Sequence, residues 1–295
     1  MRVIVKILAT ALCAMIGSSV VFAQSIKVLI IDGQNDHKNW QQITPLLKTY
    51  LEETKIFTVD ILTNPPSEGG ELDSFKPNFS EYNVVLSNYN GYSWPQKISK
   101  DFEDFVNAGG GVVIVHAANN SFPDWPAYNR MIGVGGGQGR PSGSGTAVSF
   151  NEGRNQVEQS RNIGEVATHG NAHPFRVIIR NRNHPITNGL PQVWLHENDA
   201  LYNELRGPAT NMEVLATAFS AKGQNGSDKH EPVIMVISYG KGRVFHTSLG
   251  HGIDAYKSVG FITILQRGAE WAATGSVTQK VPSNFPTANS GSRRP

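Results

Sequence analysis

Short apolar runs alternate with amphipathic segments along this chain, and this alternation restricts the fold to a few arrangements. Runs of β-branched and other apolar residues predict buried strands, whereas apolar residues that recur at helical spacing predict helices. Because strands that alternate with helices form a parallel sheet wrapped by helices, we expect an α/β protein. Strands are predicted at 26–31, 57–62, 84–86, 112–115, 175–179, 214–218, 233–237 and 243–248, and helices at 40–51, around 102–106 and at 259–273.

The periodic pattern is lost between Gly133 and Ala172, where Gly, Ser, Asn and Arg dominate. A connection of this length is usually functional or disordered, so we expect a loop over the functional site, with a disordered middle as the alternative. The Pro-, Gly- and Ser-rich residues 64–77 predict a surface connection, and residues 276–295 predict a flexible C-terminal tail. The predicted folded domain therefore spans residues 24–275.

Residues 1–23 have the features of a secretory signal peptide. Arg2 and Lys6 precede an apolar run that extends to Val21, and the small residue Ala23 marks the expected cleavage site. This run is shorter than the roughly 20 residues that a membrane-spanning helix needs, and no later segment is long and apolar enough. The sequence therefore predicts an exported protein, periplasmic or secreted, that is not embedded in a membrane.

The single cysteine of the chain, Cys13, lies inside the predicted leader. The exported chain would then contain none, which excludes a thiol nucleophile, a disulfide framework and thiolate metal ligands. Loss of Arg2 and Lys6 with the leader also lowers the 26 basic residues by two, so that they balance the 24 acidic ones. With no basic cluster beyond Arg293–Arg294, the sequence favours neither nucleic acid nor an anionic membrane as a partner.

Histidines follow several of the predicted strands. His116 ends the apolar run in GGGVVIVHAANNSFPDW, His37 follows the first strand, and His251 follows a late one. Open α/β sheets bind ligands at the carboxyl ends of their strands, so these three side chains are expected at one edge. Imidazole exchanges protons near neutral pH, which makes the three residues candidate catalytic acids and bases. The alternative is that each imidazole only caps a loop through hydrogen bonds.

A divalent metal is the competing use of these histidines. His169 and His173 have the spacing of a helical ligand pair, but a glycine and a proline in that segment oppose a helix. Imidazoles could still converge from loops and bind an ion together with Glu197 or Asp199. The cofactor is therefore left open at this stage, as is the oligomeric state. Structural or packing roles are expected for His184, His196 and His246.

Polar and aromatic residues after the central strand suit a small-molecule carbohydrate. Asn119, Trp125 and Tyr128 offer an amide and flat apolar faces, and sugars need hydrogen bonds to hydroxyls as well as stacking on their C–H faces. Trp and Tyr are more often core residues, and loop carboxylates are common, although two carboxylates that flank a glycosidic bond could hydrolyse it. The remaining candidates are Glu197 as a catalytic group, and Asp124, His173 and Asp199 as substrate-binding groups.

No nucleotide cofactor is expected from the glycine pattern. The glycine-rich stretch Gly135–Gly139 lacks the Lys-Ser/Thr pair of a phosphate-binding loop and does not directly follow a strand. Asp32-Gly33-Gln34, after the first strand, does not match the dinucleotide fingerprint either. Tightly bound NAD or ATP is therefore not predicted.

Several separate blocks of the sequence together resemble the ThuA-like, or trehalose-utilisation, family over about residues 26–273. They are Asp32-Gly33 with His37, GGGVVIVHAANNSF with Trp125 and Tyr128, HGNAHPFRV, HPIT at His184, and GKGRVFHTSLGHG at Gly240–Gly252. The resemblance implies a fold similar to class I glutamine amidotransferases, which is a flavodoxin-like, doubly wound, mainly parallel sheet with helices on both faces. It also implies a role in sugar metabolism, in particular with trehalose and oxidised (3-keto) disaccharides.

The same resemblance would place His116 where an amidotransferase carries its catalytic cysteine. Without a thiol, and without a serine in a G-x-S-x-G elbow, acyl-enzyme chemistry of that type is excluded, so the chain is not expected to hydrolyse glutamine. The family commonly has Asp-Glu before a tyrosine in the region of Glu197 to Tyr202. Here the segment reads HENDALY, and this departure leaves both Glu197 and Asp199 as candidates.

Two hypotheses for the function follow. In the first, an exported enzyme uses His37, His116 and His251 with a carboxylate to isomerise or cleave an oxidised sugar. A 3-keto group acidifies the neighbouring C–H bond, so a positioned base, helped by an imidazole or a metal that polarises the ketone, could remove that proton and expel the glycosidic oxygen. In the second, a non-catalytic sugar-binding or accessory protein has kept the fold and binds its ligand without forming product.

Overall fold

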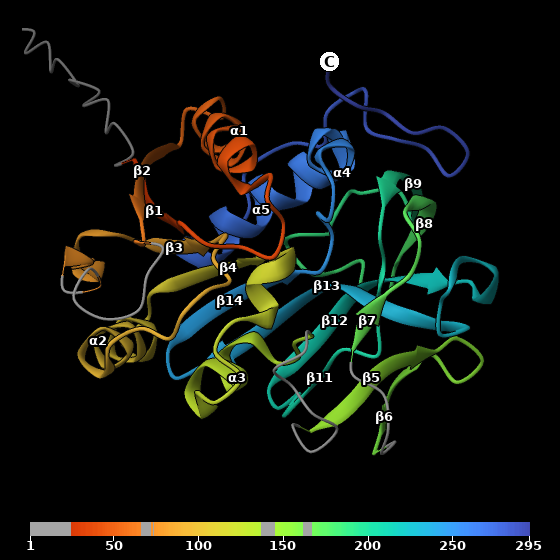
Figure 1. Cartoon of the computed structure of the whole chain (residues 1–295). Helices are drawn as coiled ribbons and strands as arrows, with labels where there is room; N and C mark the ends of the chain where they lie inside the picture. The colour runs from red at the N-terminus through yellow and green to blue at the C-terminus, as the bar shows by residue number, and fades with distance from the viewer. Residues whose placement is uncertain (1–24, 66–71, 73, 137–144, 162–166) are drawn as a thin grey trace, which may run out of the picture.

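A mixed sheet forms the centre of the structure, a computed structural model that describes residues 25–65, 72, 74–136, 145–161 and 167–295 (Figure 1). One half of the sheet is parallel, and its strand order matches the flavodoxin-like pattern of a doubly wound fold. In spatial order its strands are β2 (Phe57–Thr63), β1 (Ile26–Asp32), β3 (Val84–Ser87), β4 (Gly111–Val115) and β14 (Gly242–Thr247). The inner strands β3 and β4 are buried along their whole length, as expected when helices cover both faces, whereas only two of the seven residues of the edge strand β2 are buried.

The other half of the sheet is antiparallel and continues from β14. Its strands follow one another by short connections along the chain rather than through crossover helices, which is why they alternate in direction. In spatial order they are β13 (Lys229–Tyr239), β12 (Met212–Ser220), β8 (His173–Ile179) and β9 (Val193–Asp199). The predicted α/β fold is confirmed, with the addition that its sheet is mixed.

Helices cover both faces of the parallel half (Figure 1). The long helices α1 (Trp40–Glu52) and α5 (Val259–Thr274) pack on one face, and α2 (Gln96–Asn107) and α3 (Pro126–Ile132) pack on the other. Each face has its own apolar cluster, so the sheet lies between two cores. Helix α5 approaches the sheet closely at Gly268, where an added Cβ would lie 2.4 Å from the Phe245 ring. Shorter helical elements are η2 (Phe79–Glu81), η3 (His116–Asn120), η4 (Lys222–Gln224) and α4 (Ile253–Lys257).

Residues 133–172 were expected to be a loop, and the described part of this region contains three strands instead. β5 (Thr146–Asn151) and β6 (Gln156–Ser160) form an antiparallel hairpin, and β5 also pairs with β11 (Arg206–Gly207) and β13. β7 (Thr168–His169) pairs with β10 (Tyr202–Asn203) in a separate small sheet. The polar, largely exposed β6 carries no apolar alternation, which explains why the sequence pattern did not reveal it. Residues 137–144 and 162–166 lie outside the described chain.

Residues 276–295 were predicted to be a flexible tail, but they pack along the domain. The backbone N–H of Leu195 in the edge strand β9 donates a 2.8 Å hydrogen bond to the carbonyl of Thr287. Phe285 is buried against Trp194, with ring centroids 5.4 Å apart. An edge strand leaves backbone groups unpaired, and this segment satisfies part of that edge. Polar composition alone therefore misled the prediction.

The predicted signal peptide, residues 1–23, lies outside the described chain, as do residues 66–71 and 73 of the predicted surface connection. Within the described residues, no helix has both the length and the apolar character that crossing a membrane requires.

Candidate active site

Three histidine rings meet at the carboxyl edge of the parallel strands. His37 lies in the loop after β1, His116 directly follows β4, and His251 lies in the loop after β14. The ring centroids of His37 and His116 are 5.0 Å apart, those of His37 and His251 are 4.4 Å apart, and those of His116 and His251 are 5.5 Å apart. The structure thus brings the three predicted catalytic histidines together, at the edge where α/β folds bind ligands.

Two further side chains enter from the small sheet formed by β7 and β10. The ring of His169 lies 4.5 Å from that of His251, and the ring of Tyr202 lies 4.7 Å from that of His116. We call His37, His116, His169, His251 and Tyr202 the histidine cluster. Sequence reasoning did not assign Tyr202 a role and considered His169 only as half of a helical ligand pair. The sequence signal for His169 was the HGNAH motif alone, because the short strand that carries it lies in a region without apolar periodicity.

His116 is held in a strained backbone conformation. Its φ angle is +42°, in the left-handed region that non-glycine residues seldom adopt. Such strain persists only where the surroundings enforce it, and it concentrates at functional sites. The imidazole is fully buried, and its Nδ1 lies 2.7 Å from the carbonyl oxygen of Ser248. Because a carbonyl can only accept, Nδ1 carries the proton, and Nε2 presents a lone pair.

The lone pair on Nε2 of His116 has no hydrogen-bond partner among the described residues. A buried polar atom without a partner is rare and calls for an explanation, such as a ligand that supplies the missing donor. Since the His116 ring lies against three other members of the histidine cluster, this buried acceptor without a partner belongs to the interior of the cluster.

The cluster favours neutral imidazoles. Burial lowers the pKa of His116 to about 3, and the neighbouring His37 and His251 add to this shift while Asp199 opposes it. Burial and the nearby His37 and His169 lower the pKa of His251 to about 4. Burial also lowers the pKa of His37, against the opposing charge of Asp36. At neutral pH these rings are therefore uncharged.

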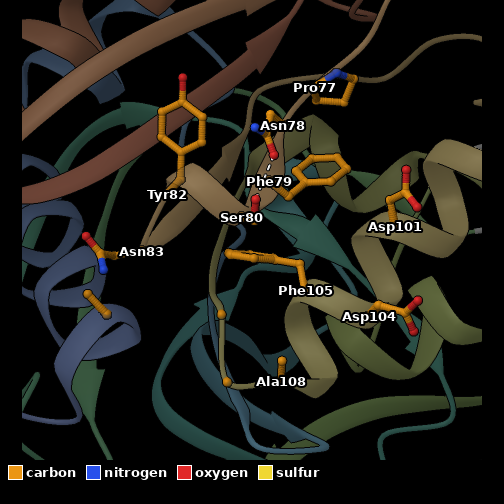
Figure 2. A pocket seen from close by; sticks show the side chains of 13 residues that line it. Pro77, Asn78, Phe79, Ser80, Tyr82, Asn83, Asp101, Asp104, Phe105 and Ala108 are labelled. Carbon is orange, nitrogen blue, oxygen red and sulfur yellow. Dashed lines mark hydrogen bonds between the residues drawn. The ribbon is translucent and has the colours of Figure 1, made fainter.

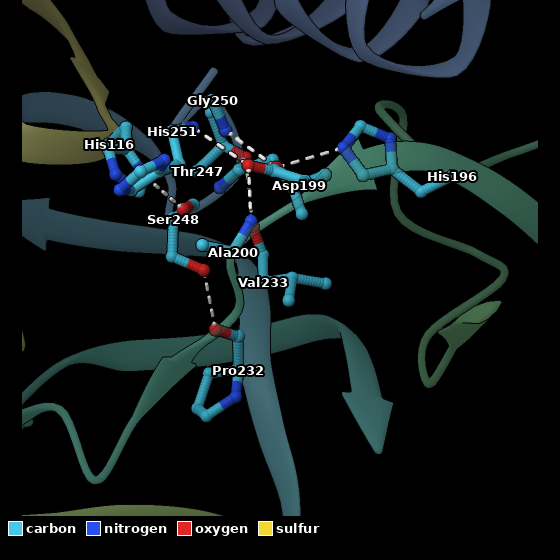
Figure 3. A network of polar contacts seen from close by, with 11 residues as sticks. His116, His196, Asp199, Ala200, Pro232, Val233, Thr247, Ser248, Gly250 and His251 are labelled. Atoms are coloured by element: carbon cyan, nitrogen blue, oxygen red, sulfur yellow. Dashed lines mark hydrogen bonds and ion pairs between the residues drawn. The ribbon is translucent and has the colours of Figure 1, made fainter. Parts of the chain in front are cut away.

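Asp199 is the central hydrogen-bond acceptor of the polar network beneath the cluster (Figure 3). This buried carboxylate accepts hydrogen bonds from the backbone N–H groups of Ala200, Gly250 and His251, and from Nε2 of His196 at 3.0 Å. Burial opposes its ionisation, but these donors hold the pKa of Asp199 below its usual value. The predicted substrate-binding Asp199 thus fixes the loop that carries His251, with its oxygens occupied by protein donors.

A second carboxylate, Asp36, lies at the exposed side of the cluster. Its Oδ2 accepts hydrogen bonds from Asn90 at 2.5 Å and from Asn120 at 3.3 Å. The same Asn120 amide donates to the hydroxyl of Tyr202 at 3.1 Å. Burial raises the pKa of Tyr202, so its hydroxyl stays protonated at neutral pH. Since that oxygen already accepts from Asn120, its own proton is available for a ligand.

Asn119, a predicted substrate-binding residue, serves the framework behind the cluster. His246 Nδ1 donates to the carbonyl of Ile132 at 2.9 Å, so His246 Nε2 accepts from the Asn119 amide at 3.3 Å. The Asn119 oxygen accepts from the N–H of Gly136 at 3.2 Å. His246 is buried within β14, as the sequence predicted for a packed residue.

Trp125, Tyr128 and Asp124 lie away from the histidine cluster. The rings of Trp125 and Tyr128 stack 5.5 Å apart in the apolar core under η3, and the Trp125 Nε1 donates to Glu103 at 2.5 Å. The Tyr128 hydroxyl donates to the carbonyl of Ala118 at 2.8 Å. Asp124 is exposed beside α2. Tyr128 therefore occupies the core role that was the alternative in the sequence analysis, whereas Trp125 is partly buried at the edge of this core and lines, with Asp124, a separate surface cavity of about 740 Å³.

Glu197 and His173 are placed on the antiparallel half. Glu197 lies on β9 beside the C-terminal segment, where a Cβ added to Gly291 would lie 2.3 Å from its Oε1. His173 begins β8, and its ring contacts Phe175 rather than the cluster, with centroids 5.7 Å apart. The carboxylates nearest to the imidazoles are therefore those of Asp36 and Asp199, and not that of Glu197.

Metal binding has no assembled ligand set in the described residues, where no group of three His, Cys, Asp or Glu side chains has the arrangement to hold an ion. The histidine rings pack edge to face on one another, with interplanar angles of 65° and 88° for the pairs of His251 with His37 and His116. These side chains therefore assign no set of metal ligands as they stand in the described residues.

A family model described as ThuA, trehalose utilisation, matches residues 27–272. The chain belongs to the ThuA family. A crystal structure described as a thua-like protein from Parabacteroides merdae is 43% identical, with a TM-score of 0.87, and the match covers 92% of this chain and 98% of that one. Another from Bacteroides uniformis is 20% identical, with a TM-score of 0.60 over 89% and 96% of the two chains, and shows the shared fold. No curated protein matches the chain.

Membership of the ThuA family confirms the resemblance drawn from the sequence and agrees with the amidotransferase-like fold. In this ThuA family protein the turn after the central strand β4 presents an imidazole, His116, in a strained conformation. A nucleophile elbow uses the same kind of turn to expose a thiol or hydroxyl. The kind of turn is thus alike, whereas the group that it carries is different.

Proposed function

We propose that this ThuA family protein is an exported enzyme that cleaves oxidised (3-keto) glycosides by acid–base chemistry at the histidine cluster. The observation that carries the proposal is the convergence of four imidazoles and the Tyr202 hydroxyl at the carboxyl edge of the sheet. The family description as trehalose utilisation supports a carbohydrate substrate. The signal peptide predicted at residues 1–23 supports action after export.

His37 is the proposed base. Its ring is partly exposed, and it is neutral near physiological pH because burial lowers its pKa. When it accepts a proton, the neighbouring Asp36 carboxylate stabilises the resulting imidazolium. A positioned imidazole of this kind typically contributes about 10²–10⁴-fold to the rate of a proton transfer.

Tyr202 and His116 are proposed to bind the reacting sugar. The Tyr202 hydroxyl donates a hydrogen bond to the ketone oxygen, where negative charge develops as the neighbouring C–H bond breaks. The unpartnered Nε2 of His116 accepts a hydrogen bond from a sugar hydroxyl. Together the two contacts place the acidic C–H bond of the sugar against His37.

The proposed reaction is an elimination that needs no oxidant or reductant. His37 removes the proton from the carbon between the ketone and the anomeric carbon, and the C–H electron pair forms an enolate. The enolate then expels the glycosidic oxygen from the anomeric carbon, which leaves a carbon–carbon double bond conjugated to the ketone. The departing oxygen takes the proton from the imidazolium, so one glycoside yields one alcohol and one unsaturated ketone, and the base is restored.

A proton NMR time course of the purified protein in D₂O tests the proposal, with 3-ketotrehalose and trehalose, each with and without a chelator. We expect consumption of the keto sugar alone, release of glucose, and the same rate with the chelator. His37→Gln, which removes the base, should slow the reaction at least 100-fold, as expected for about the lower end of general-base catalysis.

Loss of turnover on chelation would contradict catalysis by imidazoles alone and show that a metal ion takes part. If the keto sugar is not consumed but its lines broaden in the presence of protein, the enzyme proposal fails. The protein would then be the non-catalytic sugar-binding module that the sequence analysis left as the alternative.

A further inference from the structure

We infer that a second sugar ring, the uncharged leaving group of a disaccharide, binds in the cavity beside His37. This inference rests on the proposed function, because it assigns the part of the substrate that the histidine cluster does not act on. The cavity has a volume of about 380 Å³ and is lined by Gln34, Asn35, Trp40, Asn90 and Tyr92 together with two glycines. Its size lies at the small end of ligand pockets, roughly 300–1,000 Å³.

The cavity belongs to the same edge of the sheet as the histidine cluster. Gln34 and Asn35 are in the loop between β1 and α1 that also carries His37, and Asn90 and Tyr92 follow β3. The side-chain oxygen of Asn35 accepts a 2.9 Å hydrogen bond from the backbone N–H of His37. One loop therefore forms both the wall of the cavity and the support of the proposed base.

The lining has the chemistry of a neutral sugar site. Beside their contacts within the protein, the side-chain amides of Asn35 and Asn90 offer hydrogen-bonding atoms to hydroxyl groups. Two aromatic side chains, Trp40 and Tyr92, can stack on the C–H face of a pyranose ring. None of the residues that line the cavity is charged. A phosphorylated or acidic sugar would find no counter-charge in this lining, which therefore favours an unmodified sugar ring.

The cavity wall is rigid before any ligand binds. The Gln34 side-chain oxygen accepts hydrogen bonds from the backbone N–H of Tyr92 at 2.9 Å and from the Tyr89 hydroxyl at 3.1 Å. Gly91 lies directly against this amide, since an added Cβ would be 2.0 Å from the Gln34 oxygen. Gly33, with φ of +123°, would place a Cβ 2.0 Å from the carbonyl oxygen of Asn64. Both glycines are therefore required for this wall, and a preorganised wall lowers the cost of binding.

A continuous strip of hydrogen bonds joins the cavity to the reacting end of the site. Asn90, in the cavity, donates to Asp36, which also accepts from Asn120, and Asn120 donates to Tyr202. A ligand that lies along this strip would have one ring over the histidine cluster and the other between Trp40 and Tyr92. The geometry thus suits a disaccharide.

A larger cavity of about 600 Å³ lies elsewhere and does not serve this role (Figure 2). It is lined by Phe79 and Phe105 and by the stretch before β4, which is the end of that strand opposite to His116. Asp101 and Asp104 at its rim form ion pairs with Lys97 and Lys100 on the same helix, α2. Nothing connects it to the reacting groups, so the smaller cavity is the better candidate for the leaving group.

The test compares 3-ketotrehalose with methyl 3-keto-α-glucoside, which presents the same oxidised ring without the second one. Tyr92→Ala and Trp40→Ala should each raise KM for the disaccharide about tenfold, the size of one lost stacking contact, and leave KM for the methyl glycoside unchanged. The matched control is Phe219→Ala, because Phe219 is 43% exposed and Tyr92 is 41% exposed. This control should change neither KM value.

Equal changes in KM for both substrates, or no change for either, would overturn the inference. If the wild-type protein consumes neither substrate, the proposed function is wrong, but the inference about the cavity can still be tested by measuring sugar binding. Saturation-transfer NMR with unoxidised trehalose should then show signal transfer to the sugar that Tyr92→Ala abolishes and Phe219→Ala retains. Equal transfer in all three proteins would show that the cavity is not the sugar site.

Discussion

At the scale of single residues, one backbone carbonyl determines what His116 can do. The carbonyl of Ser248 holds the Nδ1 proton, so the imidazole offers its lone pair before any substrate arrives. The strained φ of +42° points this ring toward the cluster. The backbone strain of His116 and the tautomer of its imidazole thus both result from the short turn after β4.

His116→Asn separates the chemistry of this residue from its structural role. Asparagine tolerates the left-handed region and its amide can still donate to the Ser248 carbonyl, so we expect Tm to be maintained. The lone pair of Nε2 is lost, and we expect kcat/KM to fall at least 100-fold, about the lower end for groups of this kind. His230→Asn, which alters a histidine beside Phe219 outside the cluster, should keep wild-type kinetics. Retained activity in His116→Asn would remove His116 from the mechanism.

The depressed pKa of His116 also makes stability depend on pH. Its pKa is about 3 in the folded protein, whereas a solvent-exposed histidine has a pKa of 6.5, so the unfolded chain binds more protons between these values. The stabilisation is therefore complete above pH 6.5 and is lost as the pH falls toward 3, by at most ~1.4 kcal/mol per pH unit for this one group. Thermal unfolding between pH 7 and pH 4 should show a steeper fall in Tm for the wild type than for His116→Asn. Parallel curves would contradict this assignment.

The sequence predicted the residues that follow strands more reliably than those in irregular segments. His37, His116 and His251 could be found because parallel strands end at one edge of the sheet. His169 could not, since its short strand lies among glycines and polar residues without a period. Trp125 and Tyr128 show the opposite problem, because an aromatic side chain that suits a sugar also suits a core.

At the scale of elements, the antiparallel half depends on segments that carry little sequence signal. β9 was not predicted, although it positions Asp199, and its edge is covered by the C-terminal segment. The continuous apolar runs that reveal β3 and β4 in the parallel half come from burial on both faces. Strands such as β6, which are exposed, have no such pattern. The sequence therefore predicted the parallel half and three of the four antiparallel strands, β8, β12 and β13, and missed β9 and the covering segments.

Phe285→Ala tests whether the C-terminal segment contributes to stability. Removal of this ring leaves a space beside the fully buried Trp194, and we expect the free energy of unfolding to fall by about 3 kcal/mol. Phe219→Ala removes an equally large but exposed ring, so its effect should stay within about 0.5 kcal/mol. Denaturant unfolding followed by tryptophan fluorescence measures both. Equal effects of the two substitutions would mean that residues 276–295 do not stabilise the domain.

At the scale of the whole molecule, one sheet joins a doubly covered parallel half to a more exposed antiparallel half (Figure 1). The histidine cluster lies at the carboxyl edge of the parallel half, with His37, His116 and His251 after its strands and His169 and Tyr202 from the separate small sheet. The parallel half alone would present an incomplete set of groups. The site is therefore a product of the two sheets together rather than of one βα unit.

Hydrogen exchange should reveal the unequal protection of the two halves. Amides of β4, which is buried along its whole length, should exchange most slowly, through global unfolding. Amides of β6, an edge strand with exposed residues, should exchange through local opening at least about tenfold faster. Exchange followed by mass spectrometry on peptides from the two strands measures the difference. Similar rates would show that the hairpin opens only with the whole domain.

The wide separation of the cluster along the chain has a consequence for how the protein acquires function. Its members come from residues 37, 116, 169, 202 and 251, so nearly every part of the domain must be in place before the site exists. A folding intermediate that contains only the first four parallel strands would hold two of the imidazoles and no Tyr202. The rate at which catalysis recovers during refolding would thus report the last assembly step of the domain. Fluorescence and circular dichroism would also report the earlier folding steps.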